Sequence, residues 1–285
     1  MTDQSKFVVG VDVGGTFTDV FFLDEATGHC DVAKVPSTRP DQSVGFIEGI
    51  RSGVKDFSSL STVVHGTTVG TNALLERKGA VTGIITTRGF RDALEMRRRD
   101  RPTTWGLWGQ FEPVVPRNLR LEVAERTLAD GTIYTAVDPD DVKAAARQLI
   151  DAGAQSVCVV FINAYANFAN EKIAVAAVRD VWPNEHVAAS SEILPEIREF
   201  ERTSTATLNA YLQPPIGNYL QRLETALGED GFSGQVLIVQ SNGGVMSVDV
   251  ARRLPVRTAL SGPAAGVIAS AYIASVAGFP NVITC

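Results

Sequence analysis

The chain has 285 residues, of which 45% are hydrophobic and 20% charged, and its formal net charge is -6 at pH 7. These values are ordinary for a globular protein of one large or two moderate domains. The acidic balance offers no basic field for nucleic acid, and the longest apolar run near the end, 267–277, is too short to span a bilayer. We therefore expect neither nucleic acid nor membrane as a partner.

Cysteine usage and the first residues suggest where the protein is found. Cys30, Cys158 and Cys285 are scattered and lack metal-ligand spacing. Residues 1–6 are polar and contain no apolar core of a signal peptide. We expect a reducing, cytoplasmic location.

The first structured stretch is an apolar run, 7–13, which a short polar loop joins to a second apolar run, 20–23. The pattern predicts two paired strands, with Asp12 placed directly before Gly14-Gly15-Thr16. Glycines let backbone N–H groups approach phosphate oxygens, and Thr16 and Thr18 add hydroxyl donors.

Asp12 and Asp19 suit Mg²⁺, which takes oxygen ligands and often keeps its water. The simpler alternative is a tight hairpin whose aspartate caps the turn. A dinucleotide fingerprint does not fit because the loop leads into another strand, and a Walker loop does not fit because no Gly-Lys-Ser/Thr follows. The carboxylate before the glycines and the threonines after them favour a phosphate loop.

Residues 30–35 predict a third antiparallel strand. Pro40-Asp41 then opens a helix in which Gly45, Gly49 and Gly53 lie four residues apart on one face. In a chain of this composition, such a face indicates close packing.

A strand at 61–64 runs into a polar cluster, His65-Gly66-Thr67-Thr68, followed by Asn72 in the next helix. Free N–H groups at a helix start attract anions. The alternative is that Thr67 or Thr68 caps the helix and that His65 is a packed turn residue. For His65 alone packing is the better explanation, whereas for the cluster as a whole it does not account for so many polar groups.

A strand at 80–86 precedes Thr87-Arg88-Gly89-Phe90-Arg91-Asp92, and four arginines follow within 97–101. Arginines bind phosphate or carboxylate, although a solvated or inter-subunit surface explains the run equally well. Residues 102–116 are rich in Pro, Gly and Trp and predict an irregular excursion.

The next part of the chain alternates short strands with helices, which is typical of parallel βαβ units. The expected elements are a strand at 122–129, a hairpin turn at Asp130-Gly131, helices at 141–152 and 170–181, and strands at 156–162 and 187–189.

The last part begins with a charged segment, 190–200, and a long helical region that Pro214-Pro215 is expected to break, leaving a second helix at 216–227. A strand at 235–240 ends in Ser241-Asn242-Gly243-Gly244, and a strand is expected at 256–260. Ser261-Gly262-Pro263 then opens a helix, because proline fits the first turn. Each glycine turn taken singly has an ordinary chain turn as its alternative explanation. Several of them at the carboxyl ends of strands, where α/β folds bind ligands, favour a site.

Five of these blocks together resemble one family. They are 10–19, 65–76, 87–92, Gln240 to Gly244 and Ser261 to Gly266. The chain resembles the N-terminal region of the hydantoinase/oxoprolinase A-type family, which includes N-methylhydantoinase A subunits, 5-oxoprolinase and subunits of acetone and acetophenone carboxylases. The loop Asp12-x-Gly14-Gly15-Thr16 alone also suits sugar kinases. The block 65–68 distinguishes the hydantoinase/oxoprolinase family from the sugar kinases.

The resemblance implies an α/β fold of the actin-like ATPase (ribonuclease H-like) type, a mixed sheet with helices on both faces. It implies an N-terminal family domain at 1–190 and the start of the main domain at 191–285. It also implies ATP and Mg²⁺ as cofactors, a small cyclic amide or ketone as substrate, and a B-type subunit as partner in a hetero-oligomer.

The resemblance further implies roles for individual residues. We expect catalytic roles for Asp12, Asp19 and His65, with both aspartates on the metal. We expect Gly14, Gly15, Thr16, Thr18 and Gly262 to bind the nucleotide. We expect Thr67, Thr68, Asn72, Arg88, Asn242, Gly243 and Gly244 to bind substrate.

The leading hypothesis is an ATP-dependent hydrolase that opens a cyclic amide after phosphorylating its carbonyl. The alternatives are a carboxylase subunit of the acetone or acetophenone type and a non-catalytic assembly module. Proteins of the actin-like type use two phosphate loops, and only the beginning of a strand for the second is present, at 281–285. We therefore expect the chain to be part of a longer or split subunit that is inactive alone.

Overall fold

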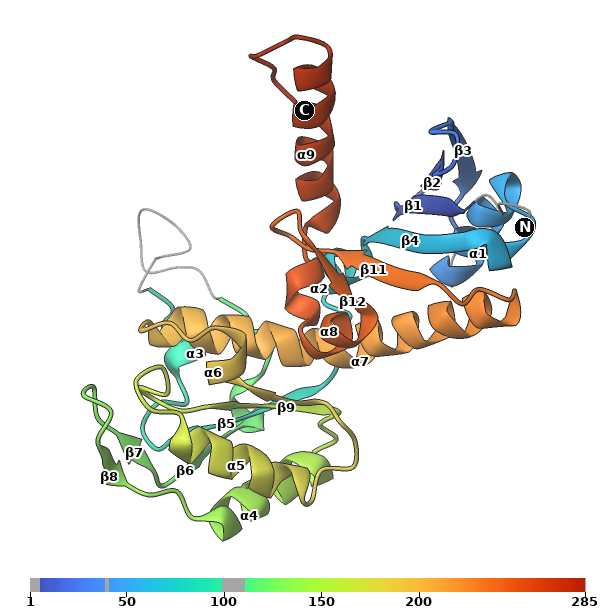
Figure 1. Cartoon of the computed structure of the whole chain (residues 1–285). Helices are drawn as coiled ribbons and strands as arrows, with labels where there is room; N and C mark the ends of the chain where they lie inside the picture. The colour runs from blue at the N-terminus through green and yellow to red at the C-terminus, as the bar shows by residue number, and fades with distance from the viewer. Residues whose placement is uncertain (1–5, 39–40, 99–110, 285) are drawn as a thin grey trace. The chain divides into compact units, whose positions relative to one another are not determined.

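The computed structural model describes residues 6–38, 41–98 and 111–284. The chain divides into two compact units, of which unit 1 comprises Met1–Glu76 and Pro215–Cys285 and unit 2 comprises Arg77–Pro214. Figure 1 shows the chain coloured from the N-terminus to the C-terminus. Spatial contacts define these units, so the sequence division at residue 190 stays a prediction about family segments.

The sheet of unit 1 has six strands within the described residues, in the order β12-β11-β4-β1-β2-β3. β1, β4 and β11 run parallel to one another, whereas the β1–β2, β2–β3 and β11–β12 pairs are antiparallel. This confirms the predicted mixed sheet and the antiparallel meander at its start. The strands are β1 (Phe7–Val13), β2 (Phe17–Asp24), β3 (Cys30–Pro36), β4 (Leu60–Thr67), β11 (Gln235–Val239) and β12 (Val245–Ser247).

The glycine face of α1 (Gln42–Gly53) packs against the meander. A Cβ added at Gly49 would lie 2.7 Å from a methyl of Val20, and one added at Gly53 would lie 2.6 Å from the ring of Phe22. Such distances leave no room for a side chain. The prediction that these glycines serve close packing is confirmed.

One predicted element of unit 1 is wrong. The strand expected at 256–260 is a 3-10 turn at Pro255–Thr258, followed by Leu260 with φ 60°. Pro255 has no backbone N–H, and the Thr258 hydroxyl donates back to the Pro255 carbonyl at 2.8 Å, which closes the turn. The other helical elements of this unit are α2 (Val69–Leu75), a 3-10 turn at Phe57–Ser59, α8 (Val248–Arg253) and α9 (Ser261–Val276).

Unit 2 contains a sheet that, in the described part of the chain, has four strands in the order β10-β9-β5-β6, all parallel to their neighbours. The predicted βαβ organisation is confirmed. The strands are β5 (Thr82–Thr87), β6 (Arg120–Val123), β9 (Ser156–Val160) and β10 (Val187–Ala189). β7 (Arg126–Thr127) and β8 (Ile133–Thr135) form the predicted hairpin. The helices are α3 (Ala93–Met96), a 3-10 turn at Arg117–Leu119, α4 (Pro139–Asp151), α5 (Ala169–Arg179) and α6 (Ser190–Ile193).

Both faces of this parallel sheet are covered. Val157 and Val159 of β9 join the apolar cluster that α4 and α5 complete. Cys158 and Val160, which point the other way, pack with Ala206 of α7 (Glu199–Glu229). The continuous apolar run of this strand is therefore explained by burial on both sides.

The prolines do not break α7, which passes through Pro214 and Pro215 without interruption. Pro215 has no N–H for the carbonyl of Tyr211, four residues earlier. That carbonyl instead accepts a hydrogen bond from the Ala80 N–H at 3.0 Å. The prediction of two helices is wrong because a partner outside the helix supplies the missing donor. No helix in the described ranges is long and apolar enough to cross a membrane.

Candidate phosphate-binding site

The loop between β1 and β2 consists of Gly14, Gly15 and Thr16. The Gly14 N–H donates to the Phe17 carbonyl at 3.0 Å and closes the hairpin, which argues against the expected nucleotide contact from this amide. A Cβ at Gly14 would lie 2.9 Å from the same carbonyl oxygen. The N–H groups of Gly15 and Thr16 have no acceptor among the described residues, and both residues are exposed. Two of the three loop amides are therefore available to an anion.

Thr18 supports this loop from inside. Its side chain is fully buried, and its hydroxyl lies 3.0 Å from that of Ser37, which donates to the Gly14 carbonyl at 2.8 Å. A buried hydroxyl with these partners argues against the expected nucleotide contact from Thr18. The exposed Thr16 remains the hydroxyl of the loop that a phosphate can reach.

Asp12 lies in a row of residues that crosses the sheet. It is in register with Asp19 on β2 and with Gly66 on β4. Asp19 forms an ion pair with Lys34 at 3.0 Å, whereas Asp12 has no hydrogen-bond or ion-pair partner among the described residues. Neighbouring in-register residues share one face of a sheet, so the two carboxylates point to the same side.

Two glycines leave space around the Asp12 carboxylate. A Cβ at Gly66 would lie 3.0 Å from Asp12 Oδ1, and a Cβ at Gly262, in the first turn of α9, would lie 4.0 Å from the same atom. Any larger side chain at either position would fill this space. The Asp12 side chain is exposed, and we call the space beside its carboxylate, bounded by Gly66 of β4 and Gly262 of α9, the hollow.

The electrostatics of the hollow favour a cation. Partial desolvation, and to a lesser extent the negative charge of Asp19, raise the pKa of Asp12. A bound cation offsets both effects. The donor set of two carboxylates beside a phosphate loop fits Mg²⁺, which binds through one or two carboxylates, water and substrate phosphates. No group of three or more His, Cys, Asp or Glu side chains suited to a metal occurs in the described ranges, so an all-protein metal cage is not present there.

The start of α9 is fixed beside the end of β4. The Leu260 N–H donates to Thr71 Oγ1 at 2.9 Å, and the Ser261 hydroxyl donates to the Thr67 carbonyl at 3.3 Å. Figure 1 shows α9 beginning beside β11 and extending from it. The N-terminus of a helix carries unpaired N–H groups and a partial positive charge. This positive end adjoins the hollow that holds the Asp12 carboxylate.

His65 is a core residue, which argues against its predicted catalytic role. The side chain is fully buried beside the ring of Phe46, with Nδ1 3.2 Å from the Val11 carbonyl and Nε2 2.8 Å from the Tyr219 hydroxyl. A carbonyl only accepts, so Nδ1 carries the proton and Nε2 accepts from Tyr219. Burial lowers the pKa of His65 to about 4. The imidazole is therefore neutral and holds β4 to β1 and α7.

The threonines after His65 brace the junction between β4 and α2. Thr68 Oγ1 donates to the Val13 carbonyl at 2.9 Å and accepts from Asn72 Nδ2 at 3.4 Å. Thr67 is buried, and its hydroxyl accepts from the Val69 N–H at 3.2 Å, which argues against a substrate contact from Thr67. Thr68 and Asn72 are half-buried, and their substrate role stays a prediction.

The remaining predicted substrate residues belong to a turn of unit 1 and to unit 2, and their substrate role stays a prediction. Asn242 and Gly244 form a turn closed by a hydrogen bond of 2.9 Å between the Asn242 side chain and the Gly244 N–H. Gly243 has φ 82°, and a Cβ there would clash with Ile268 of α9, so turn geometry and packing account for it. Arg88 is an exposed residue of unit 2, whereas the other predicted site residues belong to unit 1.

Sequence reasoning missed the position of Gly66 beside Asp12 and the part that Thr71 plays at the start of α9. Both residues lie in the block 65–76 that the sequence singled out. Their place in the site depends on the register of two parallel strands and on a contact between residues 189 positions apart. No local pattern encodes either.

The chain is similar to known proteins over nearly all of its length. The caprolactamase subunit alpha of Pseudomonas jessenii is 32% identical over 292 residues, covering 99% of this chain and 42% of that protein. The acetophenone carboxylase gamma subunit of Aromatoleum aromaticum is 32% identical over 297 residues, covering 96% of this chain and 40% of that protein. A crystal structure of the ATP-dependent caprolactamase from Pseudomonas jessenii matches with a TM-score of 0.85 and 31% identity, covering 95% of this chain and 41% of that one.

This likeness confirms the predicted α/β fold of the actin-like ATPase type. The chain spans about two-fifths of the length of these relatives. Residues 8–182 match the hydantoinase/oxoprolinase N-terminal region, and residues 202–285 match the hydantoinase/oxoprolinase domain. The chain belongs to the hydantoinase/oxoprolinase family.

Proposed function

We propose that this chain supplies the phosphate-binding part of an ATP-dependent enzyme that opens a small cyclic amide. The observation that carries the proposal is the Asp12 carboxylate in its glycine-bounded hollow, beside the two unpaired loop amides and the start of α9. The names of the relatives support ATP as the co-substrate and a cyclic amide as the substrate class.

Each group in the hollow has a role in this proposal. The amides of Gly15 and Thr16 and the Thr16 hydroxyl bind the terminal phosphate oxygens, and the positive end of α9 stabilises their charge. Asp12 and Asp19 hold Mg²⁺, which when bound neutralises phosphate charge. Phosphoryl transfer depends mainly on positioning and charge neutralisation, and these groups supply both.

The chemistry explains why a cyclic amide needs ATP. The amide is a poor electrophile because nitrogen donates electron density to its carbonyl. Transfer of the γ-phosphoryl group to the carbonyl oxygen releases ADP and turns that oxygen into part of a leaving group. One water then adds to the same carbon, and the ring C–N bond breaks as the nitrogen takes a proton, which leaves an acyl phosphate. A second water hydrolyses this acyl phosphate and releases phosphate. The products are an amino acid, ADP and phosphate.

A carboxylase subunit is the second candidate, because the acetophenone carboxylase gamma subunit is as similar to this chain as the caprolactamase subunit is. In that case the phosphoryl group goes to the oxygen of a ketone enolate and then to bicarbonate, which releases phosphate and CO₂, and the freed enolate carbon adds to the CO₂. Both relatives are named as subunits, so we propose a B-type partner subunit in either case.

The test measures phosphate release from ATP by the protein together with its partner subunit. The substrates are caprolactam, 5-oxoproline and acetophenone, each with and without bicarbonate. The hydrolase predicts release with a cyclic amide in the absence of bicarbonate, whereas release that needs both ketone and bicarbonate indicates the carboxylase. The chain alone is expected to release phosphate slowly.

The variant Asp12→Asn tests the site itself. It is expected to lower phosphate release at least 100-fold while the circular dichroism spectrum stays unchanged, because it removes charge from an exposed side chain. Asp151→Asn, on an exposed position of α4 in unit 2, is the matched control and is expected to behave as wild type. Full activity of Asp12→Asn would refute the assignment of this hollow.

A further inference from the structure

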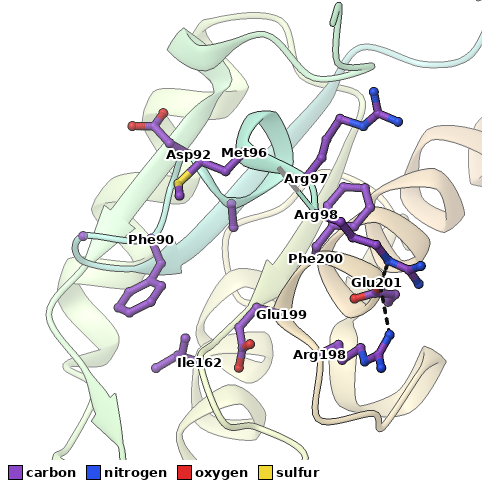
Figure 2. A pocket seen from close by; sticks show the side chains of 12 residues that line it. Phe90, Asp92, Met96, Arg97, Arg98, Ile162, Arg198, Glu199, Phe200 and Glu201 are labelled. Carbon is purple, nitrogen blue, oxygen red and sulfur yellow. Dashed lines mark hydrogen bonds and ion pairs between the residues drawn. The ribbon is translucent and has the colours of Figure 1, made fainter. Parts of the chain in front are cut away.

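A cavity of about 610 Å³ lies within unit 2 and takes no part in the proposed phosphate site. Phe90, Met96, Ile162 and Phe200 give it an apolar part (Figure 2). The charged lining residues are Asp92, Arg97, Arg98, Arg198, Glu199 and Glu201. Cavities of roughly 300–1,000 Å³ with apolar walls and a few polar groups are typical of small-molecule sites.

The arginines of this cavity already hold one carboxylate. Glu201 contacts Arg98 and lies 4.0 Å from Arg198, so its carboxylate is placed between two guanidinium groups (Figure 2). Asp92, another lining acid, accepts two hydrogen bonds from Arg117, at 2.8 and 3.0 Å. Arg117 does not line the cavity, and its positive charge compensates that of Asp92. Arg98 and Arg198 therefore suit an incoming anion of the same kind.

A buried donor lies at the inner end. Arg202 is fully buried, and its Nη1 and Nη2 donate to the carbonyls of Glu196 and Phe161 at 2.6 and 3.1 Å. Its Nε has no hydrogen-bond partner in the described part of the chain. Leaving such a donor buried and unpaired is costly, so its presence calls for an acceptor.

A second, small cavity of about 10 Å³ adjoins the larger cavity. Arg202 lines the small cavity, and both cavities share Phe90, Ala93, Ile162 and Glu199. A volume of this size holds about one water molecule. An acceptor of one-atom size, from a ligand or from a water that the ligand holds, therefore fits beside Arg202.

We propose that this cavity binds a small organic carboxylate. The carboxylate takes the place of Glu201 between Arg98 and Arg198, the apolar body lies on the Phe90–Ile162 wall, and an acceptor at the inner end receives the Arg202 Nε–H. This site is independent of the proposed function, because it uses residues of unit 2 alone.

Binding is tested by methyl NMR of the purified protein labelled at Met96 and Ile162. Benzoate and octanoate serve as probes, and neutral benzamide controls for shape without charge. Both carboxylates are expected to shift the two methyl signals in a saturable way, with benzamide at least tenfold weaker. Absence of saturable shifts with both carboxylates, or equal binding of benzamide, would overturn the proposal.

Variants separate this site from a merely structural ion-pair cluster. Glu201→Gln is expected to tighten benzoate binding several-fold, because it frees the two arginines. Arg198→Gln, at an exposed side chain, is expected to weaken it about tenfold, or about 1.4 kcal/mol. Ala93→Phe is expected to abolish binding by filling the cavity.

Arg147→Gln, on the exposed face of α4, is the matched control for loss of one arginine and should leave binding unchanged. Asp12→Asn should also leave it unchanged, which keeps failure of this site distinct from failure of the phosphate site. Weaker rather than tighter binding by Glu201→Gln would show that the ligand does not compete for these arginines and would refute the proposal.

Discussion

Acidification is expected to destabilise unit 1 through His65. Burial lowers the pKa of this imidazole from 6.5 to about 4, so the folded state binds fewer protons than the unfolded state between these values. Stability is therefore full above about pH 6.5 and is lost as the pH falls towards 4. A shift of this size corresponds to roughly 3 kcal/mol in the free energy of unfolding, taking about 1.4 kcal/mol per pKa unit.

The variant His65→Leu removes this titration and is the comparison that isolates it. At pH 7 it should be less stable than wild type by about 1–3 kcal/mol, because the Val11 carbonyl loses its donor and the Tyr219 hydroxyl its acceptor. Adding Tyr219→Phe should recover part of this loss. As the pH falls to 4, the difference between wild type and His65→Leu should shrink and then reverse.

The assay is urea unfolding followed by far-UV circular dichroism at pH 7, 6, 5 and 4, with hydrogen exchange of β1 and β4 peptides to report on unit 1. Other acids titrate equally in both proteins, so the difference reports on His65. The same pH dependence in wild type and His65→Leu would refute the reasoning. Loss of ATP-dependent phosphate release in His65→Leu with unchanged stability would instead restore a catalytic role.

Three further outcomes follow from the structure. Gly49→Ala should destabilise unit 1 by about 1–3 kcal/mol in urea unfolding, because its Cβ meets a methyl at 2.7 Å, whereas Gly228→Ala, in open space on α7, should be neutral or stabilising. Thr16→Val should slow phosphate release. Thr18→Val should lower the free energy of unfolding by about 1 kcal/mol and keep activity, because the Thr18 hydroxyl contacts the Ser37 hydroxyl inside the protein. Ala80→Pro should lower the thermal midpoint, because it removes the donor that satisfies α7 at its prolines, and an unchanged midpoint would contradict that role.

Local patterns in the sequence predicted much of the fold. The strand–loop–strand start, the glycine face of α1 and the parallel units of the middle region follow from the spacing of apolar residues and turns. The errors lie where a distant partner decides the outcome. Pro215 does not end α7 because Ala80, 135 positions earlier in the sequence, provides the donor that the proline lacks.

The candidate site shows the same limit. The sequence singles out Asp12, Gly15 and Thr16 because a carboxylate, glycines and a hydroxyl adjoin in one loop, and the structure leaves all three exposed. His65 and Thr18 lie in equally polar blocks, yet both side chains point into the core and find partners there. The direction of a side chain depends on strand register, which one sequence does not reveal.

The glycines of this chain differ in what they make room for, and that difference supports the site. At Gly49 and Gly53 an added Cβ would meet the methyl or ring of a packed neighbour, so a tight core explains the glycine. For a Cβ added at Gly66 or at Gly262, the nearest atom is instead Asp12 Oδ1, at 3.0 and 4.0 Å respectively. Two glycines beside an unpaired, partly desolvated carboxylate add no packing contact that would stabilise the fold. They do leave the carboxylate accessible to a ligand. The hollow is therefore better explained by binding than by folding.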